Sequence, residues 1–212
     1  MPEFNVLYAD ETLLVLDKPA GLLCVPGKGE DKQDCLSSRV QQHHADARVV
    51  HRLDMATSGL LVMARGANAQ RILNDAFASR QVHKRYLAVV DGLLAPPSSD
   101  WGVIDLPILL DWPNRPKRII DLQGKPSRTR WRVLKHNPTE QTTRLELEPV
   151  TGRSHQLRVH LQALQHPILG DALYGTPASL VKANRLLLHA TRLELTHPVS
   201  LHTMVFSSDS PF

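Results

Sequence analysis

The feature that most limits how this chain can fold is the series of short strand-like segments in its second half. TTRLELEPV, residues 142–150, alternates apolar and charged residues, so that Leu145 and Leu147 share one face of a predicted strand. HKRYLAVVDG and RLLLHATRLELTHP have the same strand composition. KRIIDLQGKPSRTRWRVLKH predicts a hairpin that turns at residues 123–126. Because the chain combines many strands and hairpin connections with only a few helices, the pattern favours an α+β fold with a largely antiparallel sheet.

The remaining segments predict another hairpin and a few helices. FNVLY and TLLVLDK predict two strands joined by a turn at Asp10-Glu11, and GLLVMAR, residues 59–65, predicts a buried strand. CLSSRVQQHH predicts a short helix with Asp34 as its N-cap, and ANAQRILNDAFASRQ carries an apolar stripe at helical spacing. HQLRVHLQALQ has leucines at helical spacing and predicts an amphipathic helix capped by Ser154.

Length and composition limit the class of protein. The chain has 212 residues and a mass of 23.7 kDa, which fits one large domain. Hydrophobic residues make up 42% and charged residues 22%, which excludes a disordered or fibrous protein. No apolar run approaches the ~20 residues of a membrane span, and the N-terminus has no signal-peptide pattern. Cys24 and Cys35 form no C-x-x-C motif, so we interpret them as reduced thiols of a cytoplasmic protein.

Charge is distributed unevenly along the chain. Residues 1–35 carry three Lys/Arg and seven Asp/Glu, a net charge of −4, whereas the remainder carries 22 and 14, a net charge of +8. Arginine outnumbers lysine 17 to 8, and guanidinium groups suit phosphates and base edges better than ammonium groups do. Residues 114–132 alone hold seven Lys/Arg and one Asp. The charge is compatible with a nucleic-acid partner and equally with an ordinary solvated surface.

The common catalytic motifs are absent from the sequence. It contains no P-loop, no G-x-G-x-x-G dinucleotide motif and no G-x-S-x-G nucleophile elbow. The 11 histidines form no ligand pattern: His155 and His160 are five residues apart, which places them on different faces of a helix. Neither H-E-x-x-H nor C-x-x-C occurs. The sequence therefore gives no indication of a metal or nucleotide cofactor.

Three clusters combine ionisable residues with turn-forming residues between apolar segments. They are HRLDMATSG at 51–59, KRY at 84–86 and TGRSHQLR at 151–158. Loops of this kind, held by a rigid scaffold, are where reactive side chains are usually displayed. Spacing alone does not pair Asp54 with Arg153, and taken by themselves these two residues are most simply interpreted as a structural ion pair.

Several segments together closely resemble the RluA family of pseudouridine synthases, which act on ribosomal and transfer RNA. They are LVLDKPAGLL at 14–23, HRLDMATSGLLV at 51–62, HKRYLAVV at 83–90, PVTGRSHQLRVHLQALQHPILGD at 149–171 and RLLLHA at 185–190. DWPNRPKR at 111–118 resembles the members with dual specificity for 23S rRNA and tRNA. The resemblance implies a single catalytic domain over residues 1–212, with a curved mixed sheet flanked by helices and without the N-terminal S4 domain of many relatives.

The resemblance implies an isomerase that needs no cofactor or metal. Such an enzyme breaks the N-glycosidic bond of a uridine, rotates the base and rejoins it to the sugar through carbon 5. The family's essential aspartate matches Asp54, its partner arginine matches Arg153 and its active-site tyrosine matches Tyr86. An arginine beside a carboxylate favours the charged form, which can attack or stabilise an electrophilic centre. The tyrosine offers a flat face for uracil and a hydroxyl for removal of the carbon-5 proton. Leu187 and Leu188 match the apolar wall of the pocket.

RNA contacts are expected around these residues. Arg52 lies two residues before Asp54 and is expected to fill the space that an extruded base leaves. The arginines of residues 114–132 are expected to contact phosphates, which position the RNA without reading its sequence. The residues predicted to bind RNA are Arg52, Asn114, Arg115, Lys117, Arg118, His155, Gln156 and Arg158. The predicted substrates are a tRNA anticodon stem-loop and a 23S rRNA hairpin loop, and we expect a monomer with no membrane partner.

Two other functions fit parts of the sequence. A catalytically inactive RNA-binding module would share the basic surface, but the presence of Asp54, Tyr86 and Arg153 argues against it. A carboxylate-based hydrolase would need a second acid near Asp54, and the sequence places none there. Within the favoured function, a covalent adduct and a glycal route would both use Asp54.

Overall fold

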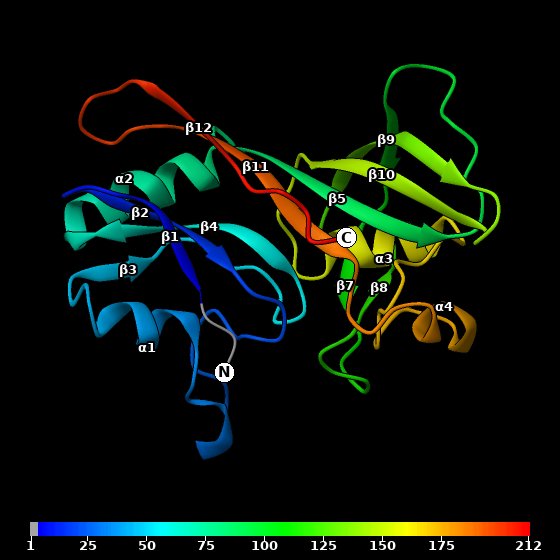
Figure 1. Ribbon diagram of the computed structural model, residues 1–212, viewed down its shortest axis with the longest axis horizontal. Helices are drawn as coiled ribbons and strands as arrows, with labels where there is room; N and C mark the ends of the chain where they lie inside the picture. Colours follow the sequence, from blue (N-terminus) through cyan, green and yellow to red (C-terminus); the bar gives the residue numbers. More distant parts are fainter. Residues whose placement is uncertain (1–3) are drawn as a thin grey trace. The chain divides into compact units, whose positions relative to one another are not determined.

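The computed structural model describes residues 4–212, which form two compact units (Figure 1). The first unit contains the chain up to Lys84 together with His189–Pro211, and the second contains Arg85–Leu188 with Phe212. Both units combine a sheet with few helices, which confirms the α+β prediction. The strand pairs within the units are antiparallel except for one, so the sheet is mixed but largely antiparallel.

The first unit is built around β2 (Leu13–Lys18) and β4 (Ser58–Arg65), two strands with buried residues on both faces. Its strands are β1 (Asn5–Ala9), β2 (Leu13–Lys18), β3 (Ala47–Val49), β4 (Ser58–Arg65), β11 (Leu188–Thr196) and β12 (Thr203–Ser207). β4 pairs with β2 and β3 in antiparallel fashion and with β11 in parallel fashion. Where β4 and β11 meet, Gly59 has a φ of +105°, and a Cβ there would lie 2.3 Å from the Ala190 carbonyl oxygen. The predicted first hairpin and the buried strand are confirmed.

The helices of the first unit are η1 (Glu30–Lys32), α1 (Leu36–Gln41) and α2 (Gly66–Ala78). The prediction of Asp34 as the cap of α1 is wrong. Cys35 is the N-cap, and its Sγ accepts a hydrogen bond from the Ser38 amide. Asp34 instead forms an ion pair with Arg39 at 2.6 Å, because the five-residue separation brings the guanidinium back over the start of the helix.

The second unit contains a four-stranded antiparallel arrangement and a separate two-stranded ribbon. The four strands are β5 (His83–Asp91), β10 (Thr142–Pro149), β9 (Arg128–Asn137) and β6 (Gly102–Asp105), in that spatial order. The ribbon pairs β7 (Ile108–Leu110) with β8 (Arg118–Ile120), and the helices are α3 (Gln156–Ala163) and α4 (Pro177–Val181). Leu145 and Leu147 are fully buried, as the alternation predicts.

The hairpin predicted between β8 and β9 is wrong in its pairing. A turn is present, closed by a hydrogen bond from the Gly124 amide to the Asp121 carbonyl, but β8 pairs with β7 and β9 pairs with β6 and β10. After the turn, Lys125 exchanges two backbone hydrogen bonds with Ile108, at 2.9 and 3.0 Å. The chain therefore leaves the ribbon beside β7 before β9 begins at Arg128.

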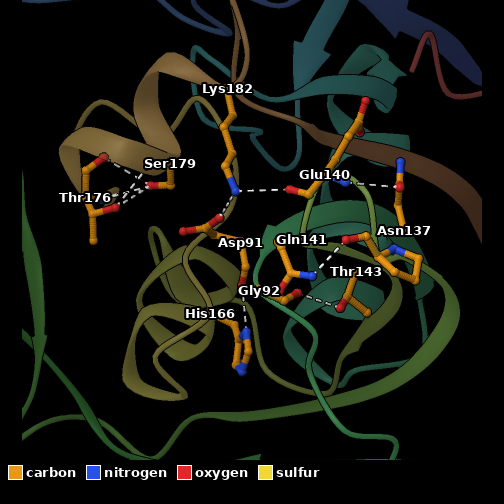
Figure 2. A network of polar contacts seen from close by, with 11 residues as sticks. Asp91, Gly92, Asn137, Glu140, Gln141, Thr143, His166, Thr176, Ser179 and Lys182 are labelled. Atoms are coloured by element: carbon orange, nitrogen blue, oxygen red, sulfur yellow. Dashed lines mark hydrogen bonds and ion pairs between the residues drawn. The ribbon is translucent and has the colours of Figure 1, made fainter.

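A polar network closes one end of the second unit, and Figure 2 shows its side chains. Gly92, with a φ of +82°, donates its amide to the Gln141 carbonyl and accepts a bond from the Thr143 hydroxyl. Lys182, which follows α4, reaches Asp91 at 2.6 Å (Figure 2). The network ties the end of β5 to the β9–β10 turn and to α4.

Candidate active site

Asp54 lies in a loop that is held on both sides by the segment that follows β2. On one side, the Leu53 amide donates to Cys24 Sγ at 3.3 Å, and the Cys24 thiol donates to the Leu53 carbonyl at 3.1 Å. On the other side, the Met55 carbonyl accepts from the Gly21 amide at 2.8 Å. Asp54 itself is half-buried, and its carbonyl closes a turn with the Thr57 amide. These bonds fix the backbone that carries the Asp54 carboxylate.

Lys18 is the central support of this loop. Its side chain is fully buried, although it is a charged residue. Its ammonium donates to the carbonyls of Pro19 and Leu22 at 2.8 Å each and to that of Met55 at 3.1 Å. A lysine ammonium has three N–H groups, so it can donate one hydrogen bond to each of these three carbonyls. The buried charge thus holds residue 55 against the end of β2.

His51 anchors the start of the same loop to β4. Its Nε2 accepts a hydrogen bond from the Val62 amide at 2.9 Å, and its ring stacks on Phe77 with centroids 4.4 Å apart. The Lys84 ammonium lies 5.6 Å from the centroid of Phe77. Burial, together with the charge of Lys84, lowers the pKa of His51 from 6.5 to about 3. His51 is therefore neutral at physiological pH, with its proton on Nδ1.

Arg153 lies in the second unit, in a segment that we name the arginine loop (residues 151–155). Gln156 holds this loop through its side chain and its backbone. Its side-chain Oε1 accepts from the backbone amide of Arg153 at 3.0 Å, and its backbone amide donates to the Arg153 carbonyl at 3.1 Å. Gln156 Oε1 also accepts from the Thr151 hydroxyl at 2.7 Å, and its Nε2 donates to the Arg128 carbonyl at 2.9 Å. The side chain of Arg153 is exposed, while its backbone is fixed.

The start of α3 differs from the prediction. Ser154 is not the N-cap; His155 is, with a φ of +57° and no side-chain cap hydrogen bond. Gln156 and Arg158 were predicted to contact RNA, but both are buried and bonded within the protein. Arg158 donates to both carboxylate oxygens of Asp171, at 2.8 and 2.7 Å. We therefore leave these two side chains out of the proposed RNA surface.

The other pocket residues of the prediction also lie in the second unit. Tyr86 is on β5, opposite Leu147 of β10, on the buried face of the strand pair. Leu188 is buried and begins β11, and Leu187 is half-buried. Leu187 donates its amide to the Leu169 carbonyl at 3.0 Å and accepts from the Val89 amide at 3.1 Å, which fixes it beside β5.

The predicted phosphate contacts cluster between β7 and β8, in a segment that we name the basic loop (residues 111–117). A bond from the Asp111 amide to the Lys117 carbonyl closes this loop at 3.1 Å. Asn114, Arg115 and Lys117 are exposed, and the Arg115 guanidinium lies 4.2 Å from the centroid of the Trp112 ring. Trp112 is 66% exposed, so the loop presents an aromatic face together with two cations.

Arg118 differs from these neighbours. It is half-buried, and its Nε is buried with no hydrogen-bond partner among residues 4–212. Its amide donates to the Tyr174 hydroxyl at 2.8 Å. Arg118 thus belongs to the base of the basic loop rather than to its tip.

The structure distributes the predicted site over both units. Arg52, which is exposed, and Asp54 lie in the first unit, whereas Tyr86, Arg153, Leu187 and the basic loop lie in the second. The pairing of Asp54 with Arg153 stays a prediction. Among residues 4–212, no three His, Cys, Asp or Glu residues are grouped as metal ligands would be. None of the helices in that range is both long enough and apolar enough to cross a membrane.

Most of the chain matches the sequence profile of a known family. The sequence profile of RNA pseudouridylate synthase matches residues 12–163, which include the loops of Asp54 and Arg153. The chain belongs to this family. Pseudouridylate synthases named "Dual-specificity RNA pseudouridine synthase RluA" are similar over its whole length. The protein of Escherichia coli O6:H1 is 46% identical over 100% of this chain and 95% of its own, and that of Haemophilus influenzae is 44% identical with the same coverage.

Solved structures of human pseudouridylate synthases have the same fold. "Human RNA Pseudouridylate Synthase Domain Containing 1" is similar with a TM-score of 0.80 and 29% identity, over 99% of this chain and 84% of its own. "Human RNA Pseudouridylate Synthase Domain Containing 4" gives a TM-score of 0.74 and 26% identity, over 97% and 88%. The predicted family and its α+β fold are thereby confirmed.

Sequence reasoning missed several residues that shape the site. Lys18 and Cys24 lie in or beside the quoted segment at 14–23, but a lysine in a strand gives no sign that it will be buried. Trp112 was detectable, because an aromatic residue among basic ones is a typical pattern of RNA contact. Tyr174 could not be recognised from the sequence, because its hydrogen-bond partners Arg118 and His155 lie 56 and 19 positions away along the chain.

Proposed function

We propose that this protein converts specific uridines of RNA into pseudouridine, with Asp54 as the essential carboxylate. The bond between N1 of uracil and C1′ of the ribose breaks, the base rotates, and a bond forms between C5 and C1′. The proton on C5 leaves and N1 gains a proton, so the reaction is balanced without an oxidant or a cofactor. The observation that carries the proposal is the family match across the loop in which Asp54 is held by Cys24, Gly21 and Lys18.

The three proposed catalytic residues supply different parts of this reaction. Asp54 attacks or stabilises the electrophilic centre that forms as the glycosidic bond breaks. Arg153 provides the positive charge that keeps a carboxylate ionised. Tyr86 presents its ring to the uracil and its hydroxyl to the C5 proton. The fixed backbones of Asp54 and Arg153 support these roles, because catalysis requires groups that are oriented in advance.

The proposed substrates are a tRNA anticodon stem-loop and a 23S rRNA hairpin loop. The relatives' name, with its dual specificity, supports two RNA substrates for this chain. The basic loop supports binding to unpaired nucleotides, because Trp112 can stack on a base while Arg115 and Lys117 meet phosphates. Arg52 is exposed next to Asp54 and is proposed to replace the extruded base in its stack.

Tritium release from RNA labelled at C5 of uridine tests the activity. Asp54→Asn keeps the size of the side chain but removes its charge, so we expect release to stop while RNA affinity remains. Asp46→Asn is the matched control, because Asp46 is an exposed partner of Arg65 at 3.2 Å. Normal turnover in the Asp54→Asn protein would contradict the proposed role. Binding without release in the wild type would instead identify an inactive RNA-binding module.

Substitution of Arg153 tests the predicted partner of Asp54. Arg153→Met keeps similar bulk and removes the charge, and we expect a severe loss of release. Arg153→Lys should restore only part of it, because an ammonium lacks the two-pronged geometry of a guanidinium. Full activity of the Met variant would show that Asp54 does not depend on this arginine.

A further inference from the structure

A line of hydrogen bonds crosses the second unit from the basic loop to the arginine loop. The Tyr174 hydroxyl accepts from the Arg118 amide at 2.8 Å and lies 2.7 Å from Nδ1 of His155. A phenol hydroxyl has one proton to donate. The oxygen of this hydroxyl therefore serves the Arg118 amide and Nδ1 of His155 at once, and the tautomer of His155 decides which of the two groups donates in the second bond. One hydroxyl thus joins two loops that are more than 30 residues apart in the sequence.

The packing of the Tyr174 ring holds its hydroxyl in one position. Tyr174 is 4% exposed, and its ring contacts Ile108 of β7 and Val159 of α3 in a small apolar cluster. The Arg158 guanidinium lies 5.1 Å from the ring centroid. Asp171 holds that guanidinium and accepts from the Tyr174 amide at 3.1 Å. Because protein interiors are close-packed, a shift of one hydrogen-bond partner of Tyr174 displaces the other.

The two ends of the line lie beside residues that the proposed function uses. Arg118 directly follows the basic loop and begins β8. His155 ends the arginine loop in a left-handed conformation, two residues after Arg153. A displacement of the basic loop moves the Arg118 amide, whose acceptor, the Tyr174 hydroxyl, is also hydrogen-bonded to His155. The geometry therefore connects the exposed RNA contact to the loop that carries Arg153.

We propose that Tyr174 is a positioning residue, which couples RNA contact at the basic loop to the placement of Arg153. The inference rests on the proposed function, because that function assigns RNA to the basic loop and a catalytic role to Arg153. Tyr174 touches neither RNA nor the reacting atoms. Its contribution is to set the geometry of the arginine loop when the basic loop is occupied.

Tyr174→Phe removes the hydroxyl and keeps the ring. We expect the single-turnover rate on a saturating anticodon stem-loop to fall about fivefold to tenfold, which corresponds to one net hydrogen bond. Tyr8→Phe is the matched control, since the Tyr8 hydroxyl donates to Asp10 at 2.8 Å within the first unit, and the rate of this variant should be that of the wild type. Circular dichroism and unfolding midpoints show whether both variants are folded.

A double-mutant cycle separates coupling from simple structural support. Arg115→Ala should lower the single-turnover rate in the wild type, and lower it less in the Tyr174→Phe background, because the link is already cut. Independent effects, which multiply, would overturn the coupling and leave the proposed function intact. An Arg115→Ala protein with unchanged affinity and rate would instead remove RNA from the basic loop, and with it both the proposed surface and the coupling.

Substitutions of His155 keep the proposal testable if Tyr174→Phe does not fold. His155→Asn retains a hydrogen-bonding group near the position of Nδ1, and asparagine tolerates the left-handed backbone. His155→Leu removes that group. We expect His155→Leu to lose as much of the rate as Tyr174→Phe would, and His155→Asn to lose less. Equal rates in the two variants would overturn the role of the line.

Discussion

Acidification should destabilise this protein through His51, and the size of the effect follows from its environment. The pKa of His51 falls from 6.5 in an exposed chain to about 3 in the fold, because burial disfavours the charged ring and the positive charge of Lys84 lies nearby. Between these values the unfolded chain binds a proton and the folded protein does not. Stability contributed by this neutral histidine is therefore complete above pH 6.5 and is lost as the pH falls toward 3. At pH 5 the loss is about 2 kcal/mol, out of the 5–15 kcal/mol typical of a folded protein.

His51→Gln isolates this contribution. The glutamine oxygen can accept from the Val62 amide, and the side chain does not titrate. We expect urea unfolding between pH 7.5 and 5 to show a smaller loss of stability in the variant than in the wild type, by about 2 kcal/mol. The other ten histidines are common to both proteins, so the difference reports His51 alone. Parallel curves for the two proteins would refute the argument that His51 is buried and neutral.

Three further predictions concern other residues of the site and its support. Tyr86→Phe keeps the ring but loses the hydroxyl, so RNA should still bind while tritium release slows markedly; release at the wild-type rate would leave Tyr86 only a stacking role. Lys18→Met leaves one buried and two partly buried carbonyls without their donor and should cost about 2–4 kcal/mol in urea unfolding, and an unchanged midpoint would contradict the supporting role. Gly59→Ala should prevent folding or greatly lower the melting temperature, because its Cβ would meet the Ala190 backbone at 2.3 Å; a wild-type melting temperature would show that β4 and β11 can separate at no cost.

Elements that bury one face could be predicted from the sequence, because periodicity reports burial directly. The alternation around Leu145 and Leu147 identified β10, and the apolar stripe around Leu73 identified α2. Strand partners could not be predicted in the same way. β8 and β9 are joined by a turn but pair with different strands, and the choice depends on backbone bonds between Lys125 and Ile108 that lie outside any local pattern.

Polar side chains were the hardest to place. Arg158 and Gln156 are residue types that often contact RNA, yet both are buried. Arg158 bonds to Asp171, and Gln156 bonds to the Arg128 carbonyl, and both partners lie in other segments of the chain. Asp34 looked like a helix cap, but Cys35 takes that role. A sequence shows which groups can form hydrogen bonds; tertiary structure decides whether their partners are protein or solvent. Residues such as Arg115, whose surroundings are local, were placed correctly at the surface.

The thiol of Cys24 gives the protein an internal reporter of the loop that carries Asp54. Burial raises the pKa of this thiol, and both backbone groups of Leu53 are bonded to it. A thiol reacts with alkylating agents as the thiolate, so Cys24 becomes reactive only when the bonds to Leu53 open and water enters. The alkylation rate of Cys24 therefore measures how often the loop next to Asp54 opens, without any added label. Cys35, buried in the same unit at the start of α1, provides the internal reference for opening elsewhere.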